Sequence, residues 1–448
     1  MRWSGKVKVS SVFLAVVLGM FPVQGVHAQR ALDVARDRGY QLEERYQPAG
    51  SIITEFHTGQ ILWQEAAQKA WPPASMTKLM TVLVAYDAMA EGKFALDTQV
   101  EVTAKYVDIA GRYALSNNKM TLGTSYTVSE LIDLIIVPSS AAATYMLADL
   151  IEPDPDKFVG LMNQKAKSLG MSQTKYYNCV GVRNDLLQPY QPAQIPINSD
   201  NVTSPEDYAL LCSYFVKTYP DILNHTKYPK IVVKEGTPYE EKFDSYQISL
   251  EGAKYGLKGT DGLKTGSSDT AGFNYSSTAQ RGDTRLIEVV MGVSYWEDQT
   301  GEEIRHLVGN AIMEQAFEKY EYRLVLEEGK HTIGGKEIVT ETDFWDCVPK
   351  KVKKIPFNLK DGKVCVDLER EYLPGYEAPS VPYQAAGTAI PGGRIAGTIL
   401  KITAGIFIAA VLAVAVRIGY VYYKKQQRKK RRRKHQERSP GRGQKHFQ

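Results

Sequence analysis

A long apolar run near the C-terminal end, residues 402–423, constrains this chain more than any other feature. At ~1.5 Å per helical residue it would span about 33 Å, which is close to the hydrocarbon thickness of a bilayer. Arg417 interrupts the run near its end, where a long side chain can reach the membrane interface. The run therefore predicts a transmembrane helix, with an amphipathic helix on the membrane surface as the alternative.

The two ends of the chain predict on which side of a membrane the rest lies. Residues 1–28 combine basic residues, an apolar run and the small-residue pattern Val26-His27-Ala28, which is typical of a secretory signal peptide cut after Ala28. Residues 424–448 are strongly basic, as expected of a cytoplasmic tail. Because most of the surplus positive charge lies in this tail, the exported body is acidic, and no nucleic-acid partner is expected.

Between these ends the apolar pattern changes once. Over residues 29–322, strand-like alternation mixes with amphipathic helices, such as those expected at 128–137 and 141–151. Residues 323–384 show short alternating runs broken by Gly, Asp, Asn and Pro, which predicts a small all-β, sandwich-like domain. Residues 385–401 are expected to form a linker to the transmembrane helix.

One stretch of the mixed region carries a residue pair suited to nucleophilic catalysis. Ser75 and Lys78 stand at the start of a long apolar helix, where a spacing of three places both on one face. A serine hydroxyl needs a base, and lysine can be that base only if burial lowers its pKa from ~10.4 towards 7. The pattern alone is weak evidence, because it recurs at Ser116 and Ser172 in polar, turn-like surroundings.

A second motif makes the first one specific. Lys264-Thr265-Gly266 occurs once, on a strand-like run that precedes a second strand. Ser-x-x-Lys followed by a Ser-x-Asn loop and Lys-Thr-Gly is the signature of penicillin-binding proteins and class A β-lactamases. With its small β domain and C-terminal anchor, the chain resembles low-molecular-mass penicillin-binding proteins of the D-alanyl-D-alanine carboxypeptidase family, over nearly its whole length.

The resemblance implies both a fold and a reaction. The fold is an α/β (α+β) penicillin-binding, β-lactamase-like transpeptidase domain, in which helices and a helical subdomain flank an antiparallel sheet. The reaction is serine-type D-Ala-D-Ala carboxypeptidase chemistry on peptidoglycan stem peptides. Ser75 would form an acyl-enzyme with Lys78 as its base, and β-lactams would be covalent inhibitors. The protein would be a single-pass protein of the bacterial cell membrane with an extracytoplasmic catalytic domain.

The Lys-Thr-Gly motif supplies the implied substrate-binding residues. Lys264 and Thr265 would bind the terminal carboxylate, because a cation and a hydroxyl suit an anion. Gly266 would leave room for close backbone approach. The backbone N–H groups of Ser75 and Ser267 would form the oxyanion hole.

The middle motif departs from the family pattern. Ser139 stands at the expected place and would relay a proton between Ser75 and the leaving amine, but Ala141 replaces the usual asparagine. The literal Ser199-Asp200-Asn201 is rejected because it lies in a Pro-rich loop, where these residues are ordinary turn formers. Ser116-Asn117-Asn118 is a weaker candidate still.

Other classes of function remain as alternatives. A DD-transpeptidase would use the same acyl-enzyme with an amine acceptor, and Ala141 leaves room for a catalytically weak, wall-associated scaffold. A class A β-lactamase is disfavoured, because its deacylating glutamate motif is absent. No cofactor or metal is expected, since the cysteines show no C-x-x-C spacing. Two of them, Cys347 and Cys365, could pair outside the cell or stay single thiols.

Overall fold

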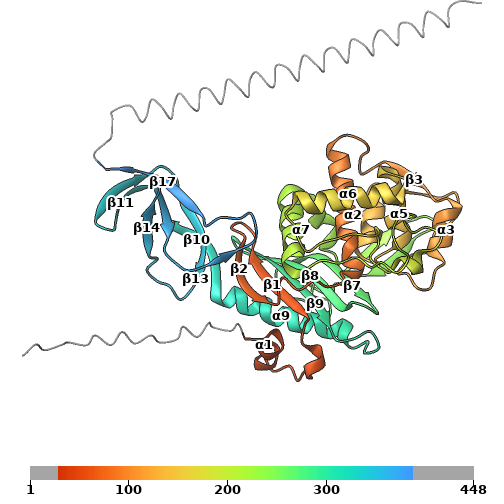
Figure 1. Ribbon diagram of the computed structural model, residues 1–448, viewed down its shortest axis with the longest axis horizontal. Helices are drawn as coiled ribbons and strands as arrows, with labels where there is room; N and C mark the ends of the chain where they lie inside the picture. The colour runs from red at the N-terminus through yellow and green to blue at the C-terminus, as the bar shows by residue number, and fades with distance from the viewer. Residues whose placement is uncertain (1–28, 387–448) are drawn as a thin grey trace, which may run out of the picture. The chain divides into compact units, whose positions relative to one another are not determined.

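The computed structural model describes residues 29–386 (Figure 1). The predicted signal peptide, the predicted transmembrane helix and the basic tail lie outside these residues, and so does nearly all of the predicted linker. Among the helices of residues 29–386, none is long and apolar enough to cross a membrane. The described chain divides into a larger unit and a smaller, β-rich unit.

A six-stranded antiparallel sheet forms the centre of the larger unit. Its order is β16-β2-β1-β9-β8-β7, and the strands are β16 (Glu371–Tyr372), β2 (Gln60–Glu65), β1 (Gly50–Glu55), β9 (Thr284–Val293), β8 (Gly272–Arg281) and β7 (Thr260–Ser268). Both β1 and β9 are buried along their whole length. Such strands need apolar residues on both faces, because successive side chains point to opposite sides of a sheet.

Each face of the sheet packs against its own set of helices. Ile53 and Val290 contribute to a core with α1 (Ala31–Asp37) and α9 (Gly301–Lys319). Their neighbours in sequence, Ile52 and Val289, contribute to a larger core with α2 (Lys78–Ala90) and α7 (Pro205–Thr218) on the other face. Figure 1 shows α7 and α9 on opposite sides of the strands, as this alternation requires.

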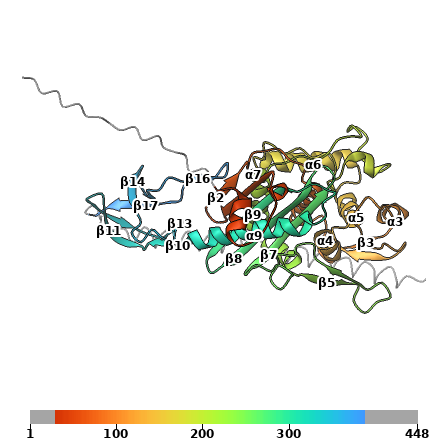
Figure 2. The same cartoon turned by 90° about the horizontal axis from the view of Figure 1, so that it is seen from below.

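A helical region beside the sheet carries the rest of the larger core, and Figure 2 shows α3, α4 and α5 gathered at the end far from β2. Several of its helices begin at residues whose side chains cap the first turn. Thr127 and Glu130 form a capping box at α4, Ser140 caps α5, and Ser204 caps α7. The helices are α2 (Lys78–Ala90), α3 (Ala104–Ala110), α4 (Val128–Ile136), α5 (Ala141–Ile151), α6 (Pro155–Ser168), α7 (Pro205–Thr218) and α8 (Leu223–Thr226), and the short hairpins are β3 (Gln99–Glu101) with β4 (Ser125–Thr127) and β5 (Lys230–Val233) with β6 (Glu241–Asp244).

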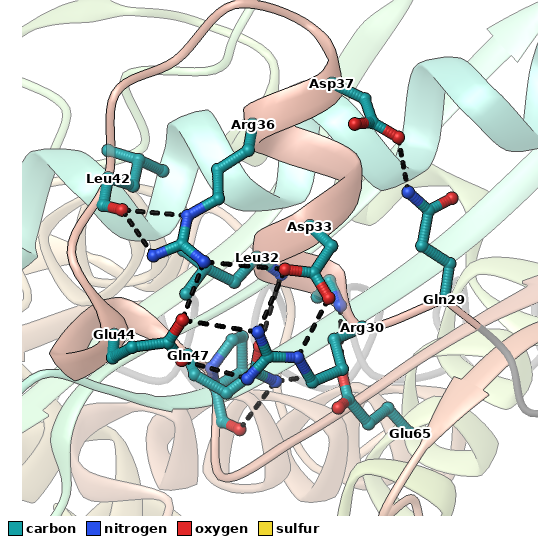
Figure 3. Close-up of polar contacts among 12 residues, drawn as sticks. Gln29, Arg30, Leu32, Asp33, Arg36, Asp37, Leu42, Glu44, Gln47 and Glu65 are labelled. Atoms are coloured by element: carbon teal, nitrogen blue, oxygen red, sulfur yellow. Dashed lines mark hydrogen bonds and ion pairs between the residues drawn. The ribbon is translucent and has the colours of Figure 1, made fainter.

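An ion-pair network joins α1 to the following turn (Figure 3). Arg30 contacts both Asp33 and Glu44 at 2.9 Å, and Arg36 contacts Glu44 at 2.6 Å. Exposed pairs of this kind contribute ~0–1 kcal/mol each, whereas burial of one leucine contributes about 1.5–3 kcal/mol. The fully buried Leu32 therefore holds α1 in place more strongly than the charges do.

Part of the β-rich C-terminal region belongs to the larger unit. Residues 343–358 and 365–380 fall in that unit, although the sequence assigns them to a separate domain at 323–384. The physical reason is strand pairing: β13 (Phe344–Pro349) pairs with β10 (Tyr320–Leu326), and β16 pairs with β2. The β16–β2 pairing joins residues about 310 positions apart in the chain, and local patterning does not encode it.

The smaller unit contains residues 328–342, 359–364 and 381–386 of the described chain. Its residues lie in a five-stranded sheet of the order β11-β12-β17-β15-β14, of which β14, β15 and β17 each extend one or two residues beyond the unit's bounds. Cys347 and Cys365, which both fall in the larger unit, are free thiols. The strands are β11 (Gly329–Ile333), β12 (Lys336–Thr340), β14 (Phe357–Lys360), β15 (Lys363–Val366) and β17 (Ser380–Ala385).

Candidate active site

Ser75 lies in a short 3₁₀ turn, η2 (Ala74–Thr77), that leads directly into α2. The turn is held from both sides, because Asn274 donates a hydrogen bond to the carbonyl of Pro72 and Tyr208 donates one to that of Met76, each at 2.8 Å. Ala74 has a φ of +48°, a conformation that costs an L-residue energy and commonly marks a functional turn. The turn leaves Ser75 partly exposed while its neighbours are buried.

Lys78 begins α2 with its side chain in the core. It is only 2% exposed, and its Nζ lies 2.6 Å from Ser75 Oγ and 3.4 Å from Ser139 Oγ. Burial lowers the pKa of Lys78 from 10.5 to about 7, because the surrounding apolar side chains disfavour the charged form; nearby Cys179 opposes this shift. An amine with this pKa is neutral in a large fraction of molecules near pH 7, so it can accept the serine proton.

Ser139 connects the first lysine to a second one. It sits between α4 and α5 with a φ of +60°, which turns its backbone sharply. Lys264 of β7 places its Nζ 3.0 Å from Ser139 Oγ and donates a hydrogen bond to the carbonyl of Thr265. Burial, the charge of Lys78 and the charge of Arg305 lower the pKa of Lys264 well below its ordinary value. Two amines and two hydroxyls thus form one continuous polar chain.

Strand β7 packs directly against the turn that carries Ser75. A Cβ atom on Gly266 would lie 2.4 Å from the carbonyl oxygen of Pro73 and 2.8 Å from the backbone nitrogen of Met76, so only glycine fits this approach. Together the two elements wall a cleft of about 570 Å³ that is open to solvent. Its lining residues are Ser75, Ser116, Ser139, Tyr246, Thr265, Gly266, Ser267, Phe273, Trp296, Gln299 and Glu302.

The predicted residues therefore come together, but in two groups. Ser75, Ser139 and Thr265 line the cleft, whereas Lys78 and Lys264 are buried behind the two serines and reach them through hydrogen bonds. Gly266 and Ser267 also line the cleft.

Arg305 is a site residue that no sequence motif identifies. It comes from α9, is fully buried, and places its Nη1 2.8 Å from Ser267 Oγ. The same Nη1 donates to the carbonyls of Gly266 at 3.4 Å and Asn274 at 3.2 Å. Burial lowers the pKa of Arg305 to about 10, which still leaves it cationic at neutral pH. Its only local signal, an Arg in an amphipathic helix, is indistinguishable from a surface charge.

The structure shows different roles for the middle motif and for the two alternatives to it. Ala141 begins α5 and is 1% exposed, so it presents no polar group to the cleft. Asn201 lies outside the cleft lining and supports the Ser75 turn instead, donating to Thr77 Oγ1 at 2.9 Å. Ser116, dismissed with the weaker candidate motif, does line the cleft.

The remaining titratable side chains give no second chemistry at this site. Within residues 29–386, no three His, Cys, Asp or Glu side chains gather in a group that could hold a metal ion. The one histidine near the site, His306, accepts from Arg305 Nε at 3.2 Å and contacts Ser249 Oγ at 3.0 Å. Burial and the charge of Arg305 lower its pKa well below the ordinary value, so it is neutral and acts as an acceptor.

Comparison with known proteins gives matches over most of the larger unit. A family model described as D-alanyl-D-alanine carboxypeptidase matches residues 42–295, and a model described as a domain of unknown function matches residues 322–384. The D-alanyl-D-alanine carboxypeptidase DacF of Bacillus subtilis is 25% identical over 279 residues, which cover 62% of this chain and 64% of that protein. The match thus spans less than two thirds of that relative's length.

Solved structures share the fold. A peptidoglycan synthesis regulatory factor (PBP3) from Streptococcus pneumoniae has a TM-score of 0.65 at 24% identity, covering 75% of this chain and 98% of that one. The cefotaxime-bound form of penicillin-binding protein D2 from Listeria monocytogenes has a TM-score of 0.51 at 25% identity, covering 62% and 99%. The predicted antiparallel sheet with flanking helices is confirmed by these likenesses and by the sheet order.

Proposed function

We propose, because the chain belongs to the D-alanyl-D-alanine carboxypeptidase family, that it removes the terminal D-alanine from peptidoglycan stem peptides through an acyl-enzyme on Ser75. The observation that carries the proposal is the 2.6 Å contact between Lys78 Nζ and Ser75 Oγ, with Lys78 buried and its pKa near 7. A nucleophile within hydrogen-bond reach of a neutral base is the arrangement that covalent catalysis requires.

The reaction begins with the substrate in the cleft. Ser75 Oγ attacks the carbonyl carbon between the two D-alanines while Lys78 takes its proton, and the backbone N–H groups of Ser75 and Ser267 stabilise the oxyanion. The proton then passes through Ser139, 3.4 Å from Lys78, to the leaving nitrogen. D-alanine departs, and water attacks the ester to release the shortened peptide.

The carboxylate end of the substrate would lie along β7. Thr265 and Ser267 line the cleft and carry hydroxyl groups, and Arg305 lies buried behind Ser267 as a cation. The amine of Lys264 is buried next to Thr265. A bound carboxylate favours the protonated form of a nearby amine, so it would raise the depressed pKa of Lys264. β-Lactams, which carry a similarly placed carboxylate, would acylate Ser75 and act as covalent inhibitors.

Two other activities use the same site. A DD-transpeptidase would pass the acyl group to an amine instead of water, and a weak penicillin-binding scaffold would acylate slowly. The buried Ala141 in place of the usual amide favours the weak scaffold, whereas the choice between water and an amine acceptor decides between the carboxypeptidase and the transpeptidase.

The experiment that tests the proposal uses the full-length protein in detergent and a peptide ending in D-Ala-D-Ala. Mass spectrometry would follow free D-alanine, and a glycine acceptor would be included in a parallel reaction. D-alanine release that is lost in Ser75→Ala supports the carboxypeptidase. Predominant glycine adducts would favour the transpeptidase, and no turnover of the peptide would exclude both.

The location is also a proposal. The signal peptide, the apolar run at 402–423 and the basic tail support a single-pass protein of the bacterial cell membrane whose catalytic unit is extracytoplasmic. Protease added to intact spheroplasts should then degrade the catalytic unit and spare an epitope tag at residue 448. Protection of the catalytic unit would contradict this orientation.

The rate of Ser75 acylation should depend on pH through Lys78. Since only the neutral amine can accept the proton, the acylation rate by a penicillin should rise with a midpoint near pH 7 and level off about one unit higher. Stopped-flow fluorescence with a labelled penicillin measures this profile. A rate that is flat from pH 5 to 9 would show that Lys78 is not the base.

A further inference from the structure

The start of α5 lacks a polar group where the family pattern provides one. In the family pattern, an amide at the position of residue 141 orients the substrate, but Ala141 carries only a buried methyl group. The substrate's peptide group on the acyl side would then have no partner from this position. A polar group that loses water on binding and finds no partner weakens binding, so a neighbouring side chain that fills this role would matter.

The loop formed by Ser116, Asn117 and Asn118 is fixed against this position. The backbone N–H of Ala141 donates to the carbonyl of Ser116 at 2.8 Å. Next to it, the N–H of Ala142 donates to Asn117 Oδ1 at 2.8 Å. These bonds join the loop to the first turn of α5.

Asn118 makes the attachment rigid. Ser140 Oγ donates to its Oδ1 at 2.7 Å, and its Nδ2 contacts Glu241 Oε2 of β6 at 3.3 Å. Asn118 is only 4% exposed, so these bonds are shielded from water. A loop held at three successive residues keeps the side chain of Ser116 in a defined place.

Ser116 is the one member of this loop that lines the cleft, which it shares with Ser75 and Ser139. It is exposed to solvent. The hydrogen bond from the N–H of Ala141 to its carbonyl places Ser116 next to the position of the missing amide. A hydroxyl can both donate and accept, as an amide can.

We infer that Ser116 is a substrate-contacting residue that replaces the missing amide and hydrogen-bonds the peptide group on the acyl side of the scissile bond. This inference rests on the proposed function. One neutral hydrogen bond of this kind corresponds to about a threefold to tenfold change in rate.

The test compares two β-lactams that differ only in this group. Benzylpenicillin carries an acylamino side chain, and 6-aminopenicillanic acid does not. In the full-length protein, Ser116→Ala should slow acylation by benzylpenicillin about threefold to tenfold and leave 6-aminopenicillanic acid unaffected. Ser116→Thr keeps the hydroxyl and should retain most of the rate. Ser172→Ala, an exposed serine outside the cleft, is the matched control.

A second variant separates contact from distortion. Adding Ala141→Asn to Ser116→Ala should restore the benzylpenicillin rate, because the amide returns to the family position. Equal rates for wild type and Ser116→Ala, or an equal loss with both β-lactams, would overturn the inference. If the wild type reacts with neither β-lactam and releases no D-alanine, the proposed function fails instead, and the inference fails with it.

Discussion

Lys78→Met is expected to lower the rate of Ser75 acylation by about a hundredfold to ten-thousandfold, the range by which a general base accelerates a reaction. Methionine has nearly the same shape as lysine but cannot accept a proton. The hydroxyl of Ser75 would then keep its ordinary, weak nucleophilicity. Lys175→Met is the matched control, because Lys175 ends another Ser-x-x-Lys pattern and is exposed.

The same substitution should stabilise the fold. In the unfolded chain the amine keeps its ordinary pKa near 10.5, whereas in the folded protein it is about 7. The destabilisation is therefore complete below pH 7 and disappears as pH rises through about 10.5. Methionine avoids this cost, so the free energy of unfolding of the variant at pH 7 should be higher by on the order of a few kcal/mol. Its melting temperature should rise accordingly. Unchanged acylation, or a stability gain that grows with pH, would contradict this account of Lys78.

Gly181→Ala should both destabilise the protein and disable Ser75. Gly181 has a φ of +87°, and a Cβ there would lie 1.8 Å from the carbonyl oxygen of Ala74 and 2.6 Å from Thr77 Oγ1. The substitution must push the turn that holds Ser75. We expect a loss of about 2–5 kcal/mol in the free energy of unfolding, from backbone strain and overpacking together. A displacement of ~1 Å at the nucleophile costs about a hundredfold in rate.

Gly170→Ala is the matched control for backbone strain. Its φ is +78°, but no atom lies within 4 Å of the added Cβ. This variant should lose only about 1–2 kcal/mol and keep normal acylation. Urea unfolding and the rate of penicillin labelling measure both effects. Equal behaviour of the two glycine variants would show that close packing at Gly181 does not position Ser75.

The sequence predicted the centre of the site well because local spacing encodes it. A helical interval of three sets Ser75 and Lys78 on one face, and the unique Lys-Thr-Gly run identifies β7. Ser116 and Arg305 were not selected from the sequence, because their places at the site depend on contacts between residues that are distant in the chain. Arg305 lies on α9, and its contact with Ser267 depends on how that helix packs against the sheet. No local pattern specifies such a contact.

In the fold, too, local sequence predicts some elements, whereas contacts between distant residues decide others. Helices with clear caps, such as α4 with Thr127 and Glu130, lie where their sequence predicts them. The two-residue strand β16, which pairs with β2 across about 310 positions of sequence, is too short to carry a period-two pattern. The grouping of residues 365–380 with the larger unit therefore required the structure.

The proposed reaction depends on acylation of Ser75. Intact-mass and peptide-mass analysis of the full-length protein after exposure to benzylpenicillin measures this directly. We expect one penicilloyl adduct per chain, located on the peptide that contains Ser75 and absent from Ser75→Ala. An unmodified protein, or an adduct that persists in Ser75→Ala, would contradict it.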